Sequence, residues 1–173
     1  MEPRREMPTS PTSSVPLVAV LCGSKSDLPL LQATQATLQQ FDIGHEVRVL
    51  SAHRTPAELL RFVSEAPSRG VEVFIAAAGG AAHLAGVIAA HTTAPVIGLP
   101  VPSQHLSGLD SLLSIVQMPK GVPVATVAIG GAENAAILAV QMLALKYPEL
   151  SQRLADFRTK QARAVLEEAA PDS

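Results

Sequence analysis

The segment Pro16–Cys22 reads PLVAVLC, and the pentapeptide GSKSD at residues 23–27 follows it directly. An uncharged run of this length with valines at alternate positions is typical of a strand that is buried on both faces of a sheet. The polar stretch with its glycine is typical of a turn, and it precedes a helical pattern. That pattern places residues three and four positions apart, which predicts one sheet-facing stripe: Leu31, Thr34, Leu38 and Phe41.

The same alternation of a short strand with a longer helix continues along the chain. Four further runs, rich in β-branched residues, predict strands at residues 45–50, 71–77, 95–99 and 124–129. Strands that alternate with helices form parallel sheets covered on both faces. We therefore expect an α/β protein with three layers, α/β/α, a five-stranded parallel sheet at its centre and a C-terminal helix.

Three of the predicted helices have distinct patterns. Thr55, Pro56 and Glu58 predict a helix start with a capping box, in which the threonine hydroxyl caps the first turn. Residues 135–145 are apolar almost all round, so this helix needs cover on every side, which one small domain does not supply. We expect it to pack between the subunits of a homo-oligomer. The last helix, at residues 149–168, has an ordinary amphipathic pattern.

The composition argues against several classes of function. Thirteen Lys and Arg residues against fifteen Asp and Glu residues give a formal net charge of −2, so no overall field favours nucleic acid or an anionic membrane. Four phenylalanines, one tyrosine and no tryptophan leave little on which single-stranded nucleic acid or a flavin could stack. Cys22 is the only cysteine, which excludes an internal disulfide. We expect it to be a small buried residue at a strand end.

One uncharged stretch raises the question of a membrane span. Residues 73–109 contain no Asp, Glu, Lys or Arg over 37 positions, but glycines, prolines and histidines interrupt them. We interpret the stretch as buried strand, helix and strand. Residues 1–14 are rich in proline, serine and threonine and lack the apolar core of a secretory signal, so we expect a flexible arm. We expect residues 15–168 to form a single domain and residues 169–173 to fray.

Ligands of open α/β sheets bind beyond the carboxyl ends of the strands, so the residues after each predicted strand are the candidates for a site. After the first strand, GSKSD offers hydroxyls at a helix N-terminus, which suits a phosphate, and Asp27, which suits ribose hydroxyls. A plain serine or aspartate helix cap explains the same residues. After the second strand come Ser51, His53 and Arg54, of which arginine suits a phosphate and histidine titrates near neutrality. A solvated surface pair is the alternative.

The third and fourth loops differ in character. Residues 78–83, AGGAAH, carry no side chain larger than a methyl group for five positions, which leaves backbone amides open to a planar or anionic group. Tight packing of a helix on the sheet needs the same glycines. Residues 100–108 form a longer loop, with Ser103, Gln104 and His105, that either covers a site or simply connects two elements. The spacing of the five histidines is not that of a metal site, so we expect no metal.

Taken together, four blocks resemble the PurE family: GSKSD at 23–27, SAHRTP at 51–56, AGGAAHLAG at 78–86 and SGLDSLLSIVQMPKGVPVATVAIGGAENAAILA at 107–139. Members of this family are purine-biosynthesis enzymes that form 4-carboxy-5-aminoimidazole ribonucleotide (CAIR). They have a flavodoxin-like, Rossmann-like fold and assemble as octamers. The resemblance therefore implies a flavodoxin-like sheet, a homo-octamer and a cytoplasmic enzyme of IMP biosynthesis.

The family contains two reactions. One moves the carboxylate of N5-carboxyaminoimidazole ribonucleotide (N5-CAIR) from N5 to C4, and the other carboxylates aminoimidazole ribonucleotide (AIR) directly with CO2. Residues 51–55, SAHRT, and residues 79–83, GGAAH, are similar to the first class, so the resemblance implies an N5-CAIR mutase, an isomerase that transfers the carboxylate. A CO2-dependent AIR carboxylase and an inactive ribonucleotide-binding subunit are the alternatives.

The resemblance also implies roles for single residues. It makes His53 the general acid and base. It implies that Ser24, Asp27 and Arg54 hold the ribose phosphate portion, assisted by Ser26 and Ser51. It places the CO2 and the imidazole against Gly79, Gly80, Ala82, His83 and Leu84. No cofactor is implied, and the implied partners are a small-molecule ribonucleotide, further copies of the chain and, transiently, the upstream N5-CAIR synthetase.

Overall fold

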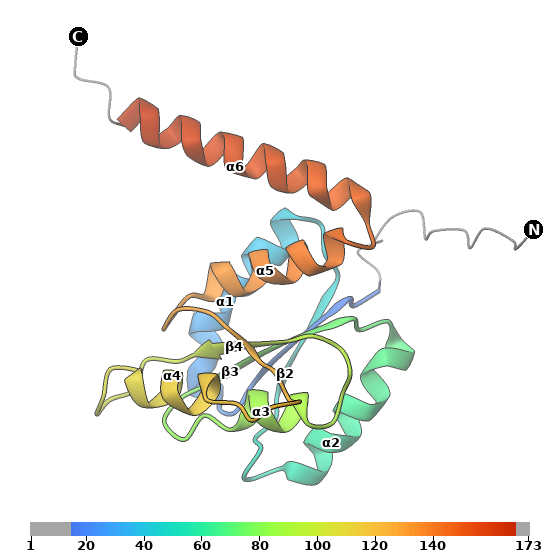
Figure 1. Ribbon diagram of the computed structural model, residues 1–173, viewed down its shortest axis with the longest axis vertical. Coiled ribbons are helices and arrows are strands. Elements are labelled where there is room, and N and C mark those ends of the chain that lie inside the picture. Colours follow the sequence, from blue (N-terminus) through green and yellow to red (C-terminus); the bar gives the residue numbers. More distant parts are fainter. Residues whose placement is uncertain (1–14, 169–173) are drawn as a thin grey trace, which may run out of the picture.

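The computed structural model describes residues 15–168 and has a five-stranded parallel sheet at its centre (Figure 1). The strands are β1 (Val18–Cys22), β2 (His45–Val49), β3 (Val73–Ala78), β4 (Val96–Pro100) and β5 (Ala125–Thr126). Their order in the sheet, β2-β1-β3-β4-β5, is that of flavodoxin-like folds. The predicted fold class is confirmed. The expected arm at residues 1–14 and tail at residues 169–173 lie outside the described residues.

Helices cover both faces of the sheet (Figure 1). One face carries α1 (Leu28–Gln40) and α5 (Ala132–Ala144), with α6 (Pro148–Glu168) packed against α5. The other face carries α2 (Pro56–Glu65), α3 (Leu84–Ala89) and α4 (Leu109–Val116). Two short 3-10 turns, Lys25–Asp27 and Ala66–Arg69, precede α1 and follow α2. No described helix is long and apolar enough to cross a bilayer.

The three central strands are buried along their whole length, which explains their uncharged sequences. Successive side chains of a strand point to opposite faces. In β1, Val18, Val20 and Cys22 accordingly join the core beneath α1 and α5, whereas Ala19 and Leu21 join the core beneath α2, α3 and α4. The edge strands β2 and β5 are only half-buried. The predicted stripe on the first helix is confirmed, because all four residues are buried.

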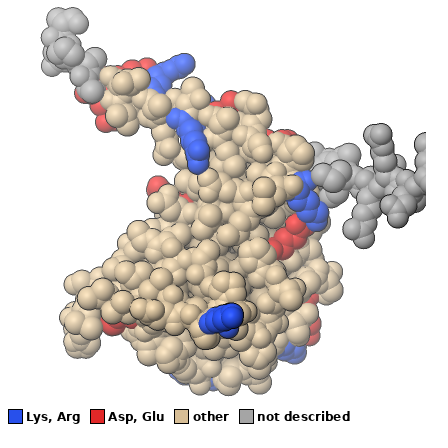
Figure 2. All heavy atoms as spheres, viewed as in Figure 1, with Lys and Arg blue, Asp and Glu red and all other residues tan. Residues whose placement is uncertain are grey.

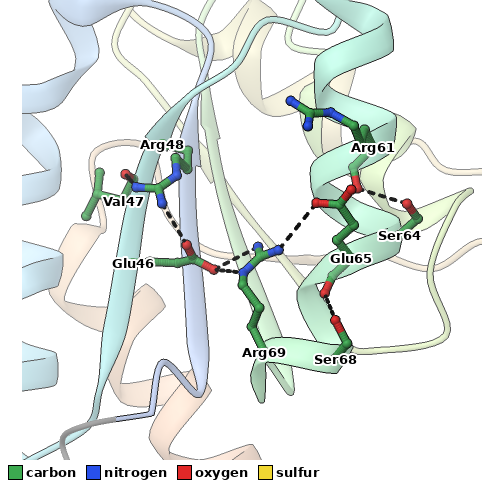
Figure 3. Close-up of polar contacts among 8 residues, drawn as sticks. All are labelled: Glu46, Val47, Arg48, Arg61, Ser64, Glu65, Ser68 and Arg69. Atoms are coloured by element: carbon green, nitrogen blue, oxygen red, sulfur yellow. Dashed lines mark hydrogen bonds and ion pairs between the residues drawn. The ribbon is translucent and has the colours of Figure 1, made fainter.

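A network of charges ties the edge strand β2 to the end of α2 (Figure 3). The Glu46 carboxylate lies 3.0 Å from the Arg69 guanidinium and 3.1 Å from that of Arg48. Glu65 makes a longer ion pair of 3.9 Å with Arg69. The guanidinium carbons of Arg69 and Arg48 lie 4.7 and 5.9 Å from the centre of the Phe62 ring. Charged side chains on an edge strand oppose pairing with another chain.

The predicted capping box before α2 is wrong in its hydrogen bonds. Thr55 is the N-cap residue and Pro56 occupies the first turn, but the threonine side chain makes no cap bond. Its hydroxyl instead accepts a hydrogen bond from the Ser51 N–H (2.8 Å) and donates to the Ser51 carbonyl (3.2 Å). The threonine therefore closes the turn that precedes the helix. These two bonds form because the loop before α2 brings Thr55 next to Ser51, four residues earlier.

The fifth strand is shorter than the predicted span of residues 124–129. Only Ala125 and Thr126 pair with β4 as a regular strand. Beyond them, the Val127 N–H donates to the Gly98 carbonyl (3.1 Å), and a turn closes between Gly131 and Ala128. The chain thus keeps a backbone contact with β4 while it bends towards α5.

The apolar helix α5 is only partly covered within one chain. Its residues Ala135, Ala139 and Leu143 are fully buried or nearly so, whereas Ile137 and Leu138 are half-buried. α6 packs through its first half and then extends away from the body, so that Val165 and Leu166 are exposed (Figure 1). Figure 2 shows large uncharged areas on the visible face of the body.

Candidate functional site

The loops after β1, β2, β3 and β4 surround one cavity of about 460 Å³ at the carboxyl ends of the strands. Parallel strands end at the same edge of a sheet, so four loops that are distant in sequence meet there. Ten of the eleven predicted site residues line the cavity: Ser24, Ser26, Asp27, Ser51, His53, Arg54, Gly79, Gly80, His83 and Leu84. The eleventh, Ala82, is buried in the core beneath α2, α3 and α4, because its methyl group points into the protein.

The loop after β1 carries the first polar group of the cavity. Ser24 caps the 3-10 turn, since its Oγ accepts the Ser26 N–H at 3.3 Å. Ser26 Oγ lies 2.9 Å from Ser24 Oγ and 3.2 Å from Asp27 Oδ1. Burial raises the pKa of the Asp27 carboxyl, while the Ser26 hydroxyl, the Ser24 backbone and the Arg54 charge act against this rise. The helix-cap interpretation is thus confirmed for Ser24, and the same residues line the cavity.

Arg54 and Ser51 join the loops after β1 and β2. The Arg54 Nη2 donates to the Gly23 carbonyl at 2.6 Å, and its Nε lies 3.4 Å from Ser51 Oγ. Ser51 is almost completely buried, and its Oγ accepts the backbone N–H groups of His53 (3.3 Å) and Arg54 (3.2 Å). Ser51 therefore holds the backbone that presents the histidine and the arginine.

Two histidines meet across the cavity. His53 Nε2 lies 2.8 Å from His83 Nδ1, and the two rings are nearly perpendicular, at 86°, with centres 4.9 Å apart. One nitrogen of this pair must donate and the other accept, so at least one of the two rings is neutral while the bond exists. The strand order brings the two residues together, because β2 and β3 both pair with β1 and the loops after them meet at the same edge of the sheet.

The loop after β3 forms a wall of small residues beside the histidines. Gly80 adopts φ +65°, a left-handed conformation that favours glycine. A Cβ added at Gly79 would make an ordinary contact with the Val101 Cβ at 3.6 Å, so the wall lies beside the loop after β4 with room for a methyl group between them. Hydroxyl groups, a carboxyl, a guanidinium and two imidazoles thus face a wall that carries only methyl groups.

The loop after β4 contributes residues that sequence reasoning placed only partly. Ser103 lines the cavity together with Val101 and Pro102, whereas Gln104 and His105 are exposed and do not line it. Val101 and Pro102 were missed, since an apolar residue in a loop carries no chemical signal of its own. The helix α4 was not predicted either, although its residues lie within the block at 107–139 that carries the family resemblance.

Cys22 lies at the end of β1 beneath the site and is not part of its chemistry. Its side chain is fully buried, and its Sγ donates to the Ser24 carbonyl at 3.2 Å. Burial and the nearby Asp27 carboxylate raise the pKa of this thiol to about 11. A thiol protonated at neutral pH is a poor nucleophile. The prediction of a small buried residue at a strand end is confirmed.

The fold and the cavity define the class of protein, an open parallel α/β protein whose site at the carboxyl ends of the strands combines hydroxyl groups, a carboxyl and a guanidinium with an imidazole pair. A comparison with protein families identifies it further. The model of the AIR carboxylase family matches residues 17–164. The chain belongs to this family.

Curated relatives of known name are similar over most of this chain. An N5-carboxyaminoimidazole ribonucleotide mutase of Saccharolobus solfataricus is 55% identical over 88% of this chain and 96% of that protein. A protein of the same name from Mycobacterium tuberculosis is 55% identical over 90% of each chain. A phosphoribosylaminoimidazole carboxylase of Candida glabrata is 54% identical over 90% of this chain, which is 27% of the longer fungal protein.

Solved structures support the same fold. The crystal structure of Treponema denticola PurE matches with a TM-score of 0.81 and 27% sequence identity, over 88% of this chain and 96% of that one. The resemblance to the PurE family that the sequence blocks carried is confirmed by this match and by the family model.

Proposed function

We propose that this chain is an N5-carboxyaminoimidazole ribonucleotide mutase, which converts N5-CAIR into CAIR in the cavity at the ends of β1 to β4. The names of the relatives at 55% identity support this reaction. The observation that carries the assignment to the cavity is the pair formed by His53 and His83, 2.8 Å apart. It lies in a cavity that is also lined by the anion-binding Arg54 and by the Gly79–Gly80 wall.

The polar end of the cavity holds the ribose phosphate portion of the substrate. Arg54 supplies a planar donor fork that matches phosphate oxygens. The hydroxyls of Ser24 and Ser26 are further donors, and Asp27 accepts hydrogen bonds from ribose hydroxyls. The substrate competes for Arg54 with the Gly23 carbonyl at 2.6 Å, so binding exchanges one hydrogen-bond acceptor for a charged one. Ser51 assists from behind the loop through the backbone bonds described above.

The chemistry takes place at the other end, against His53 and the small-residue wall. In the first step the bond between N5 and the carboxylate carbon breaks, CO2 is released into the cavity and N5 takes a proton from His53. In the second step C4 forms a bond to the CO2 carbon, and the C4 proton passes to His53, which restores its starting state. Atoms and protons balance, and one imidazole serves as acid and then as base.

The wall explains why the intermediate CO2 is retained. Gly79, Gly80 and Leu84 line the cavity there, and Ala82 closes it from behind. These residues offer no charged group to CO2, which stays close to C4 instead of mixing with solvent. His83 Nδ1 lies 2.8 Å from His53 Nε2 and orients that ring, and the proposal requires the oriented ring to reach both N5 and C4.

An isotope experiment tests this reaction. Freshly prepared N5-CAIR, labelled with carbon-13 in its carboxylate, is incubated with the protein in excess unlabelled bicarbonate, and the label is measured in the CAIR product. The mutase reaction predicts that most of the label is retained, because the CO2 stays in the cavity. A reaction without protein measures the spontaneous loss of the carboxylate.

The other outcomes contradict the proposal in different ways. The Candida glabrata relative is named a carboxylase, and direct carboxylation of AIR would give unlabelled CAIR. If no CAIR forms above the rate without protein, the chain only binds a ribonucleotide.

The assembly and location of the enzyme belong to the same proposal. We expect a homo-octamer in the cytoplasm that transiently contacts the upstream N5-CAIR synthetase. Support for the assembly comes from large apolar side chains that stay exposed on and around α4: Leu106, Leu109, Leu113, Val116 and Ile129. Light scattering tests it, with an octamer at eight times the chain mass of 18.0 kDa and a monomer as the contradicting result.

A further inference from the structure

We infer that Ser111 is a positioning residue for the reaction: from the first turn of α4 it fixes the Gly79–Gly80 wall and, through it, His83. The inference rests on the proposed function of the cavity. Ser111 does not line the cavity and is fully buried, and no part of the catalytic assignment above uses it.

The Ser111 hydroxyl joins two of the loops that surround the cavity. Its Oγ accepts the Gly80 N–H at 3.0 Å and donates to the Val101 carbonyl at 2.8 Å. A hydroxyl has a single hydrogen. Because that hydrogen is engaged by Val101, the lone pairs of Ser111 are left to accept the Gly80 N–H. The fold therefore makes the Ser111 hydroxyl an acceptor for Gly80 and a donor to Val101.

Apart from hydrogen bonds, little holds Gly80 in place. A Cβ added at Gly80 would find no heavy atom within 4 Å, so no neighbour packs against this residue on that side. Its φ of +65° is only one of several regions that glycine adopts with ease. A second hydrogen bond comes from one turn further along α4, where Ser114 Oγ donates to the Gly80 carbonyl at 3.3 Å. Two hydroxyls of one helix thus hold both polar groups of the Gly80 backbone.

The first turn of α4 is itself anchored. Asp110 Oδ1 accepts the Ser103 hydroxyl at 2.6 Å and the Ser111 N–H at 2.9 Å. Ser103 Oγ also accepts the Gly108 N–H at 3.0 Å. The hydrogen bond from Ser103 is the main cause that lowers the pKa of the Asp110 carboxyl, so this residue is a carboxylate at neutral pH. Ser111 therefore acts from a fixed position.

The Gly80 peptide is connected directly to the histidine pair. The Gly80 carbonyl accepts the Ala82 N–H at 2.9 Å, and the Ala81 carbonyl accepts the His83 N–H at 2.8 Å. This tight turn leads into α3, whose N-cap is His83. A rotation of the Gly80 peptide would therefore displace His83, whose Nδ1 lies 2.8 Å from His53. Displacements of about 1 Å at a reacting group cost up to about 100-fold in rate.

The test replaces one oxygen atom. We expect Ser111→Ala to lower kcat by about 10- to 100-fold and to change KM by less than about 2-fold, because the groups that hold the ribose phosphate are untouched. In the same variant, without substrate, the backbone amide of Gly80 should exchange with deuterium at least about 10-fold faster, since its acceptor is gone.

The matched control is Tyr147→Phe, which also removes one buried hydroxyl. Tyr147 donates to Glu72 at 2.8 Å, next to the start of β3 and therefore at the opposite end of the sheet from the cavity. This variant should lose stability without change in kcat or in the exchange of Gly80. It separates a general loss of stability from a specific effect on the wall.

Either of two results would contradict the inference. A kcat of Ser111→Ala within about 2-fold of the unsubstituted protein overturns the positioning role, and so does an unchanged exchange rate at Gly80. If the unsubstituted protein forms no CAIR, the proposed function fails by itself, and the inference that Ser111 holds the wall then depends on the Gly80 exchange rate alone.

Discussion

Replacement of His53 by asparagine is the sharpest test of the catalytic assignment. The His53 side chain is exposed to the cavity, and its hydrogen-bond partner is His83 at 2.8 Å. Exposed substitutions usually change the free energy of unfolding by less than about 0.5 kcal/mol, so Tm should move by no more than about 2 °C. The loss of one general acid–base group should lower kcat by about 100- to 10,000-fold, which corresponds to about 2.7 to 5.5 kcal/mol of transition-state stabilisation.

The assay follows CAIR formation from N5-CAIR and the binding of substrate separately. His91→Asn is the matched control, because His91 is also exposed, and its Nδ1 contacts the Val87 carbonyl at the end of α3, outside the cavity. We expect this control to keep full activity. If His53→Asn binds substrate normally and retains more than a tenth of kcat, general acid–base catalysis by His53 is refuted.

Three further predictions follow from single contacts. Arg54→Lys should raise KM about 10-fold and leave kcat within about 3-fold, because an ammonium group does not reproduce the planar donor fork that holds the phosphate in the proposed complex; steady-state kinetics measures both. Gly98→Ala should lower the free energy of unfolding in urea by about 1 to 3 kcal/mol, since its Cβ would lie 2.3 Å from Ile115 Cγ2. Native protein at pH 8 should resist alkylation at Cys22 with iodoacetamide, whereas unfolded protein should react. As the folded pKa of this thiol is raised to about 11, ionisation of the unfolded thiol should also lower stability from about pH 9 towards pH 11, relative to Cys22→Ala.

The central strands could be predicted because their environment is uniform. β1, β3 and β4 are buried on both faces, so every position favours an apolar residue and the run stands out in the sequence. The edge strand β5 lacks this signal. Its regular pairing lasts for two residues, and what ends it is the turn that closes between Ala128 and Gly131. Within that turn the Gly130 N–H donates to the Pro100 carbonyl of β4 at 2.9 Å, and the local sequence does not record where a neighbouring strand offers such an acceptor.

The same distinction holds in the candidate site. It could be predicted that the loops after the strands meet in one site, because parallel strands bring their carboxyl ends to one edge of the sheet. The hydrogen bonds that each side chain makes there could not be predicted. Ser51 was expected to assist with the ribose phosphate, and the sequence did not indicate that its Oγ also accepts the backbone N–H groups of His53 and Arg54. Thr55 was expected to cap α2, yet it bonds back to Ser51. Hydroxyl groups satisfy whichever backbone group lies nearest, and this is decided by the fold.

The residues around Gly80 show that a site also depends on residues that do not line its cavity. The histidine, arginine and serines that line the cavity follow their own strands, so a search of strand ends finds them. Ser111 and Ser114 lie in a helix that follows β4, and they reach the loop after β3 only because β3 and β4 are neighbours in the sheet. Residues that contact the loop of a neighbouring strand therefore cannot be identified from the sequence until the strand order is known. In this fold the strand order 2-1-3-4-5 is what places the first turn of α4 within hydrogen-bond distance of the Gly79–Gly80 wall.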